Sequence, residues 1–337
     1  MRINHIVFLM IVLLAGPAAL GFGGGAAEGT DVPGDQPLEK ITLVLDWVPN
    51  TNHTGAYVAQ AEGFFAQEGL DVEIVQPSEI GADAMVAAGR AEFGFSYQEG
   101  VTFARTAQNP VPVVSIAAVI QHNTSGFAGP ASRNLEGPAD FEGKRYGGWG
   151  SAVEEATIHA LMEQAGADPS TVEFLNIGSA DFFQSIQRDI DFAWIFWAWT
   201  GIEAQIRGVE LDYVDLGKVN PVFDYYTPVI ITSESLIEEE PGLISRFLAA
   251  LTKGYEFAMT QADAAAAILV EAVPEIPLEL ARESQAFLAD QYQAEAPVWG
   301  HQRREVWSRY AGWLYGEGFL EQQLDVDQAY TNEFLPR

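Results

Sequence analysis

Short apolar runs alternate with helical patterns along most of the chain. Residues 41–45 form a β-branched and apolar run typical of a buried strand, and a helical pattern over 54–65 leads to a second strand at 72–75. The alternation continues with a helix over 81–88 and strands at 93–97 and 111–120. Strands that alternate with helices predict a mainly parallel sheet flanked by helices.

The alternation restarts after Gly143 and predicts a second α/β lobe. The strands expected there are 144–146, 172–177 and 191–196, and the helices are 151–165 and 180–186. One more strand is expected at 226–233. The rest of the chain reads as helices over 241–261, 262–272, 278–291 and 303–317.

The N-terminus has the profile of an export signal. Residues 1–21 carry an arginine, a short apolar run and then small residues, which predicts a signal peptide, and residues 22–37 read as a flexible linker. The apolar run, 6–14, falls well short of the roughly 20 residues that a spanning helix needs. With no cysteine for lipid attachment, we expect a periplasmic or secreted protein without stable membrane insertion after signal removal.

Composition excludes several classes of function. The 337 residues carry a formal net charge of −30, which disfavours nucleic acid as a partner. The absence of cysteine excludes disulfides, thiolate nucleophiles and iron–sulfur clusters. No Gly-x-Ser-x-Gly, Walker A or His-Glu-x-x-His pattern occurs. We therefore assign no catalytic residue, no metal and no cofactor.

Ligands of open α/β sheets bind beyond the carboxyl ends of the strands, where loops and helix N-termini converge. Candidate site residues should therefore follow the predicted strands. The segments that this rule selects are 46–53, 97–99, 121–125, 147–154 and 197–203.

Several of these segments resemble one family, in the order in which they occur. The runs are Leu45-Asp-Trp-Val-Pro-Asn-Thr-Asn-His-Thr-Gly55, Gly94-Phe-Ser-Tyr-Gln-Glu99, Gln121-His-Asn-Thr-Ser-Gly126, Gly148-Trp-Gly-Ser-Ala-Val-Glu-Glu155 and Trp194-Ile-Phe-Trp-Ala-Trp199. They are similar to the thiamine-precursor family, which joins periplasmic pyrimidine-binding proteins of the ThiY type with a fungal pyrimidine-synthesising enzyme. The similarity covers nearly the whole predicted exported portion.

The resemblance implies a two-lobed periplasmic-binding-protein fold of type II. It also implies that the protein delivers its ligand to the permease and ATPase of an ABC importer. The ThiY branch is associated with formylaminopyrimidine, a thiamine breakdown product. Two crossings between the lobes, near residues 126 and 225, would divide the chain into lobe 1 (38–126 and 226–337) and lobe 2 (127–225).

Departures from the family's enzyme argue for a binding protein. That enzyme holds pyridoxal phosphate on a lysine and consumes a histidine, and the matching positions here are Ser96 and Gly100. Its cysteine-rich iron segment matches 222–226, which contains no cysteine.

A methyl-aminopyrimidine offers a flat ring and an amine, so aromatic rings and carboxylates are the expected contacts. The ring candidates are Trp47, Tyr97, Trp197, Trp199 and Tyr225. Trp47 and Tyr97 are preferred because each follows a strand, and packing in the core is the alternative for every ring.

Glu99, Glu154 and Asp224 are the candidate carboxylates. Glu99 is expected in mid-loop, and Glu154 has a structural alternative, because Ser151 and Glu154 fit a helix capping box. His53, in the run that begins at Asn50, is expected to cap or orient the first helix.

The leading hypothesis is a solute-binding protein for a thiamine pyrimidine precursor of the formylaminopyrimidine or hydroxymethylpyrimidine type. One alternative is a binder of another flat or small solute, such as a riboflavin-like ring or a sulfonate. A sulfonate would require basic side chains that the selected loops almost lack. A pyrimidine-synthesising enzyme is the least favoured alternative.

Overall fold

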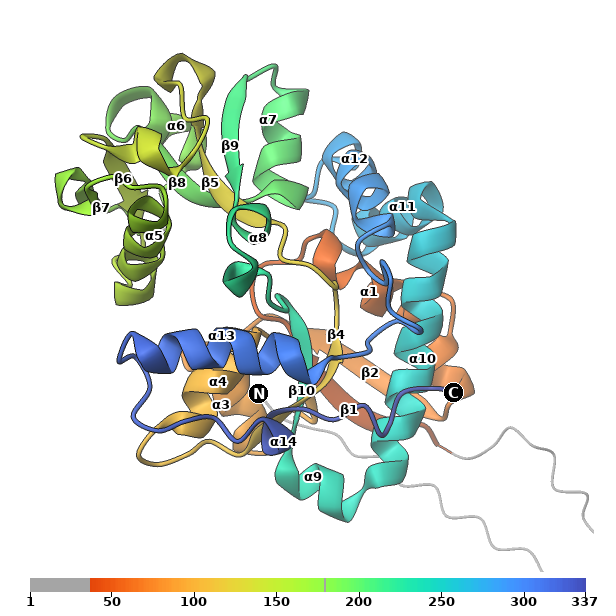
Figure 1. Cartoon of the computed structure of the whole chain (residues 1–337). Coiled ribbons are helices and arrows are strands. Elements are labelled where there is room, and N and C mark those ends of the chain that lie inside the picture. The colour runs from red at the N-terminus through yellow and green to blue at the C-terminus, as the bar shows by residue number, and fades with distance from the viewer. Residues whose placement is uncertain (1–36, 179) are drawn as a thin grey trace, which may run out of the picture. The chain divides into compact units, whose positions relative to one another are not determined.

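The computed structural model describes residues 37–178 and 180–337, which fold into two five-stranded sheets with flanking helices (Figure 1). This confirms the predicted two-lobed α/β class. The predicted signal peptide and nearly all of the linker, residues 1–36, lie outside the described residues. Within the described part of the chain, no helix is both long and apolar enough to cross a membrane.

The first sheet has the order β2-β1-β3-β10-β4. Its strands are β1 (Glu39–Val44), β2 (Leu70–Val75), β3 (Phe93–Ser96), β4 (Val113–Ala118) and β10 (Val229–Ser233). β10 pairs antiparallel with both of its neighbours, so four strands share one direction and β10 is reversed. β3, β4 and β10 are buried along their whole length, in keeping with their mostly apolar sequences.

The second sheet has the order β7-β6-β8-β5-β9. Its strands are β5 (Ser125–Pro130), β6 (Arg145–Gly148), β7 (Glu173–Asn176), β8 (Phe192–Phe196) and β9 (Leu211–Asp215). Here β5 is the reversed strand. The prediction of mainly parallel sheets is therefore confirmed for four strands of each sheet and missed one reversed strand in each.

The sequence analysis did not predict β5 or β9. β5 contains two glycines and a proline, which disfavour a strand on propensity alone. The glycines are needed because side chains would collide with close neighbours, the Tyr213 ring at Gly126 and the backbone of Asp191 at Gly129. Close backbone approach therefore outweighs propensity here.

The carboxyl edges of the two sheets are joined by two chain crossings. β4 ends at the carboxyl edge of the first sheet, and after six intervening residues β5 begins with Ser125 beside Phe196, the last residue of β8. The return crossing runs from β9 to β10, whose Val229 pairs with Ser96, the last residue of β3. Residue 126 lies in β5 and residue 225 in the return crossing, and the division into lobes at these positions stays a prediction.

Helices fill the connections and follow β10. They are α1 (Thr54–Ala61), α2 (Phe64–Gln67), α3 (Gly81–Ala87), α4 (Gln98–Thr106), α5 (Ala152–Gln164), α6 (Phe182–Arg188), α7 (Ile202–Ile206), α8 (Leu216–Val219), α9 (Glu234–Glu239), α10 (Pro241–Thr260), α11 (Ala262–Ala272), α12 (Leu278–Ala289), α13 (Arg304–Gly316) and α14 (Val326–Ala329). The helix predicted over 54–65 is divided into α1 and α2 because Gly63 adopts a left-handed φ of 69°.

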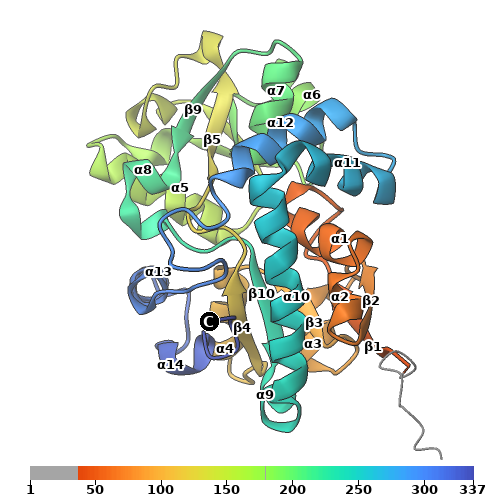
Figure 2. The same cartoon turned by 90° about the vertical axis from the view of Figure 1, so that its right-hand side faces the viewer.

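The long helix α10 packs along α1 and α2 and covers one face of the first sheet (Figure 2). Its buried residues recur at helical spacing, and the Phe247 ring stacks on Phe93 of β3 with centroids 3.8 Å apart. α10 approaches α1 through glycines, because a methyl group on Gly254 would overlap the carbonyl oxygen of Gly55.

Candidate ligand-binding site

The loop after β1 is organised around the buried carboxylate of Asp46. His53 Nε2 lies 2.6 Å from Asp46 Oδ1, and the Asn50 N–H donates to His53 Nδ1 at 3.1 Å, so Nε2 is the nitrogen that donates to Asp46. The hydroxyl of Tyr97, the residue after β3, lies close to the same carboxylate. Burial alone would raise the pKa of Asp46, but the His53 bond and the nearby Tyr97 hydroxyl hold it below its usual value.

Three predicted site residues therefore share this network. Asn50 caps the short 3-10 turn Thr51–His53 by accepting from the Asn52 N–H, and the fully buried His53 accepts the Asn50 N–H in return. The His53 ring makes no capping bond to α1, so a role in orienting that helix stays a prediction. Tyr97 is half-buried, and burial raises its pKa, so its hydroxyl remains a donor.

Trp47 follows Asp46 directly and differs from these neighbours because 54% of the residue is exposed. Among the described residues, no aromatic ring stacks on its indole. The structure thus places a flat apolar face beside the Asp46 network, and its contact with a ligand stays a prediction.

Glu99 lies in the first turn of α4, so its expected place in mid-loop was wrong. The helix was missed because Gln98–Thr106 is short and polar at its start. Tyr310 of α13 donates its hydroxyl to Glu99 Oε2, and Tyr225 stacks on Tyr310 with centroids 4.0 Å apart.

Only one Glu99 oxygen is occupied in this arrangement. No donor among residues 37–178 and 180–337 reaches its Oε1 within hydrogen-bond distance. Burial raises the pKa of Glu99, the Tyr310 bond opposes this, and the charge of Glu154 in α5 raises it further. The half-buried carboxylate therefore retains an open acceptor for a donor from outside the chain.

Across the crossings, Glu154 lies in the first turn of α5, the helix that follows β6. The predicted capping box is confirmed, because Ser151 Oγ accepts from the Val153 N–H at 3.2 Å and Glu154 Oε2 accepts from the Ser151 N–H at 2.9 Å. Glu154 also accepts from the Tyr146 hydroxyl at 2.6 Å and the Trp149 N–H at 3.1 Å. Both oxygens are thus used within the protein, and a ligand bond to Glu154 stays a prediction.

The tryptophans after β8 lie in a π-helical turn, Trp197–Gly201. Trp197 packs against Tyr213 with centroids 4.6 Å apart, and its ring covers Gly201. Trp199 packs with Tyr57 and Ile276 in a small apolar cluster. Each ring has the packing role that was expected as the alternative to ligand contact.

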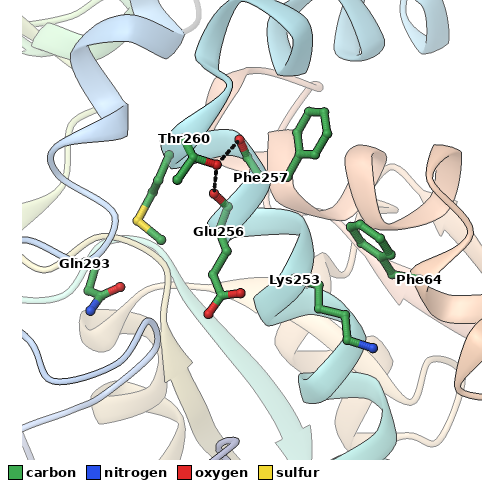
Figure 3. A pocket seen from close by; sticks show the side chains of 7 residues that line it. Phe64, Lys253, Glu256, Phe257, Thr260 and Gln293 are labelled. Atoms are coloured by element: carbon green, nitrogen blue, oxygen red, sulfur yellow. Dashed lines mark hydrogen bonds between the residues drawn. The ribbon is translucent and has the colours of Figure 1, made fainter.

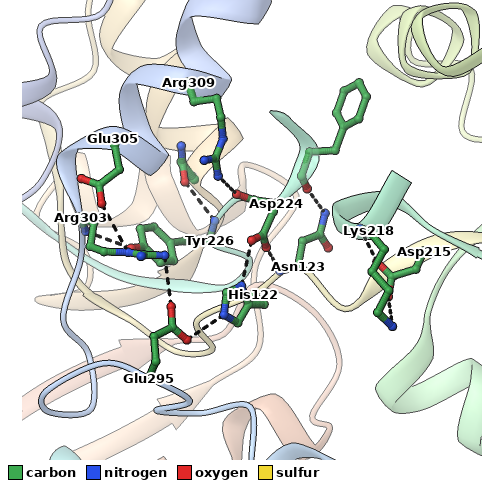
Figure 4. A network of polar contacts seen from close by, with 12 residues as sticks. His122, Asn123, Asp215, Lys218, Asp224, Tyr226, Glu295, Arg303, Glu305 and Arg309 are labelled. Atoms are coloured by element: carbon green, nitrogen blue, oxygen red, sulfur yellow. Dashed lines mark hydrogen bonds and ion pairs between the residues drawn. The ribbon is translucent and has the colours of Figure 1, made fainter. Parts of the chain in front are cut away.

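Asp224 lies in the return crossing and binds the other crossing (Figure 4). Its carboxylate accepts from the Asn123 N–H at 3.0 Å and lies 2.8 Å from His122 Nδ1. His122 Nε2 lies 2.9 Å from Glu295, which also pairs with Arg303. The bond to Asp224, despite partial burial and with help from Glu295, raises the pKa of His122 to about 9.

The segments that the strand-end rule selected stay a prediction, and the sequence analysis did not single out three residues that contact or adjoin the candidate residues. Asp46 carried a readable signal, as an acid directly after a strand, and so did Trp149, an aromatic residue between two glycines after β6. Tyr310 carried none, because its helix is remote in sequence from Glu99.

No lysine or arginine of the described chain pairs with Asp46, Glu99 or Glu154. Asp83, which accepts from the Ser96 hydroxyl at 2.7 Å, adds another carboxylate near Asp46, and burial raises its pKa. Such an edge favours a ligand that donates hydrogen bonds and disfavours an anion. Among the described residues, no group of three or more His, Asp or Glu side chains is placed to hold a metal ion.

A separate hollow of about 650 Å³ lies on the helical side of the first sheet (Figure 3). It is lined by residues of α2, α10 and the loop after α12, namely Phe64, Lys253, Glu256, Phe257, Met259, Thr260 and Gln293. None of the predicted site residues lines it, so it is distinct from the strand-end site.

Two α/β sheets joined at their carboxyl edges by two crossings define the periplasmic-binding-protein fold. The solved alkanesulfonate-binding protein SsuA from Xanthomonas axonopodis pv. citri, bound to MOPS, superposes with a TM-score of 0.66 over 87% of this chain and 98% of that one. The identity is 12%, so the likeness shows the fold alone.

The family described as NMT1/THI5 like matches residues 50–265, and the chain belongs to this family. A formylaminopyrimidine-binding protein of Halalkalibacterium halodurans is 30% identical over 88% of this chain and 91% of its own length. A riboflavin-binding protein, RibY, of Chloroflexus aurantiacus is 24% identical over 100% of this chain and 97% of its own. A 4-amino-5-hydroxymethyl-2-methylpyrimidine phosphate synthase of Legionella pneumophila is 24% identical over 88% of this chain and 92% of its own length.

Proposed function

We propose that this chain is an extracytoplasmic solute-binding protein of an ABC importer, and that it captures a thiamine pyrimidine precursor of the formylaminopyrimidine or hydroxymethylpyrimidine type. The family and the 30% identical formylaminopyrimidine-binding relative support this proposal. So does the residue 1–21 profile, which is that of a signal peptide. The permease and the ATPase of the importer are the partners that such a protein requires.

The observation that carries the proposal is the open acceptor on Glu99. A half-buried carboxylate with one oxygen bound to Tyr310 and the other without a protein donor suits an aminopyrimidine, whose exocyclic amine donates. Trp47 and Tyr97 follow the neighbouring strands and supply rings for its flat face. Trp197, Tyr225 and the groups around Asn50, His53, Ser151 and Asp224 support the pocket in this proposal.

Riboflavin is the second candidate, because the RibY relative covers this chain fully. An isoalloxazine ring is larger but also flat, and it donates through a ring N–H. A sulfonate is disfavoured, because the carboxylates of this edge have no basic partner within the described residues. Titration with both kinds of ligand separates these alternatives.

The enzyme alternative is disfavoured by the chain's own side chains. The resemblance places Ser96 where the family's enzyme has its cofactor lysine, and Ser96 is buried with its hydroxyl bonded to Asp83. A hydroxyl has no amine with which to hold pyridoxal phosphate, so these residues do not fit that cofactor. Gly100 likewise has no imidazole to contribute.

Isothermal titration of the purified exported portion tests the function. The ligands are formylaminopyrimidine, hydroxymethyl-aminopyrimidine, riboflavin and MOPS. We expect binding of a pyrimidine and a loss of about 10- to 150-fold in Glu99→Gln, because a charge-assisted bond contributes roughly 1.5 to 3 kcal/mol. Binding of MOPS but of no flat heterocycle would contradict the proposal.

Glu279→Gln is the matched control for this experiment. Glu279 is the second residue of α12, as Glu99 is of α4, but it is exposed to solvent. We expect its affinity to equal that of the parent. If Glu99→Gln folds and binds as tightly as this control, Glu99 is not the amine acceptor.

A further inference from the structure

The two sheets repeat one plan. Each has its reversed strand in the fourth position of its order, so β1 corresponds to β6 and β3 corresponds to β8. The residue directly after β3 is Tyr97, and the residue directly after β8 is Trp197. Equivalent strand ends of the two sheets therefore carry aromatic residues.

The loops after β1 and β6 share a rarer feature. Trp47 is 54% exposed and Trp149 is 51% exposed, and no other tryptophan of the described chain is comparably exposed. An indole left half in water retains a large apolar face, which is typical of a surface that binds a partner or a ligand.

The backbone beneath Trp149 is fixed although its ring is uncovered. Both carboxylate oxygens of the buried Glu154 lie within 3.2 Å of the backbone nitrogen of Trp149, whose N–H donates to them. Gly150, the next residue, has a φ of 79°, and the Asn176 side chain packs so closely that a Cβ would not fit. Among the described residues, no aromatic ring stacks on the Trp149 indole.

The same loop lies at the edge by which the second sheet is joined to the first. Glu154, which binds the Trp149 N–H, lies close enough to Glu99 for its charge to raise the Glu99 pKa. β6 also ends at the carboxyl edge of the second sheet, the edge to which both crossings connect the first sheet. Trp149 thus lies at the carboxyl edge of the second sheet, which the crossings join to the carboxyl edge that carries Glu99 and the Asp46 loop.

We propose that Trp149 is a ligand-stacking residue, which the second sheet contributes to cover a flat ring held by Trp47, Tyr97 and Glu99 of the first sheet. The inference rests on the proposed function and adds a contact from the second sheet. Because Trp149 is fixed at its backbone, it presents a rigid ring at little entropic cost.

Titrations of Trp149→Ala and Trp149→Phe with formylaminopyrimidine and hydroxymethyl-aminopyrimidine test the inference. Loss of one stacking ring should weaken binding roughly 5- to 150-fold in Trp149→Ala, by analogy with base stacking on aromatic residues. Trp149→Phe keeps a flat ring and should recover most of the affinity. Tyr315→Ala, at another exposed aromatic residue, should bind like the parent.

Acrylamide quenching of tryptophan emission gives a second readout. Ligand should shield the two exposed indoles in the parent, and the shielded fraction should fall in Trp149→Phe. If the parent binds and folded Trp149→Ala has the same Kd, this assignment is overturned while the proposed function stands. If the parent binds neither pyrimidine, the proposed function fails and the assignment fails with it.

Discussion

The hydrogen bonds that a carboxylate makes within the protein indicate whether it stabilises the fold or can bind a ligand. The three carboxylates that show this are Asp46, Glu99 and Glu154. Asp46 accepts from the His53 ring and lies beside the Tyr97 hydroxyl, and Glu154 accepts from a hydroxyl and two backbone N–H groups. A buried carboxylate that is fully bonded in this way fixes local structure. Glu99 has a spare oxygen, and this difference makes it the residue that we expect to meet the ligand.

Replacing Asp46 by asparagine should destabilise the protein. The new side-chain amide would turn a donor toward the His53 N–H, which donates to Asp46, or toward the nearby Tyr97 hydroxyl, so we expect a loss of about 1 to 3 kcal/mol in the free energy of unfolding. Urea unfolding at neutral pH measures it. Asp71→Asn, at an exposed position of β2, should change stability little, and an equal effect of the two substitutions would contradict the argument.

The contribution of Asp46 to stability should also depend on pH in the acid range. Because the pKa of Asp46 is lower in the folded protein than in the unfolded chain, its stabilising contribution is present above the unfolded value, near 3.8, and is lost as pH falls through the folded value. Asp46→Asn lacks this contribution, so its stability should converge on that of the parent at low pH.

The helical layer depends on a close crossing between α1 and α10. Gly254→Ala would place a methyl group on the Gly55 carbonyl, so we expect a loss of about 1 to 3 kcal/mol as the helices separate. Gly312→Ala, inside α13 with open space around it, should instead stabilise by about 1 kcal/mol through helix propensity. Thermal unfolding of both variants checks this, and a stabilised Gly254→Ala would refute the close contact.

Elements with a local signal were predictable from the sequence. The Ser151 and Glu154 pattern predicted the start of α5, and the apolar periodicity of α10 predicted nearly its full length. β5 was not predictable, because its glycines satisfy contacts with distant residues. The Glu99 bond to Tyr310 joins residues 211 positions apart, so no local pattern could indicate it.

At the scale of the whole molecule, His122 binds the two crossings together and to Glu295 beyond α12. The folded pKa of His122 is about 9, above its ordinary value of 6.5, so its stabilising contribution is complete below about pH 6.5 and is lost as pH rises through 9. We therefore expect the thermal midpoint of the parent to decrease as the pH is raised from about 7 to 10, partly because His122 loses its proton.

His122→Gln should flatten that dependence. Asp224, Glu295, Arg303 and Arg309 are the charged groups around the network, and the His122 side chain is 37% exposed, so the effect should be modest, about 1 kcal/mol or less. His159→Gln, at a similarly exposed histidine of α5, is the control. A parent and a His122 variant with parallel pH profiles would show that the histidine does not stabilise the crossings.

The position of β10 also bears on the order of folding. β10 lies between β3 and β4, yet it is synthesised after every strand of the second sheet. All strands of the second sheet come from one continuous segment of the chain. β3 and β4, in contrast, keep an unpaired edge until β10 has been synthesised. Because β10 must pair with β3 and β4 across the whole of the second sheet's sequence, we expect the first sheet to fold more slowly than the second and to be more prone to aggregation before it is complete.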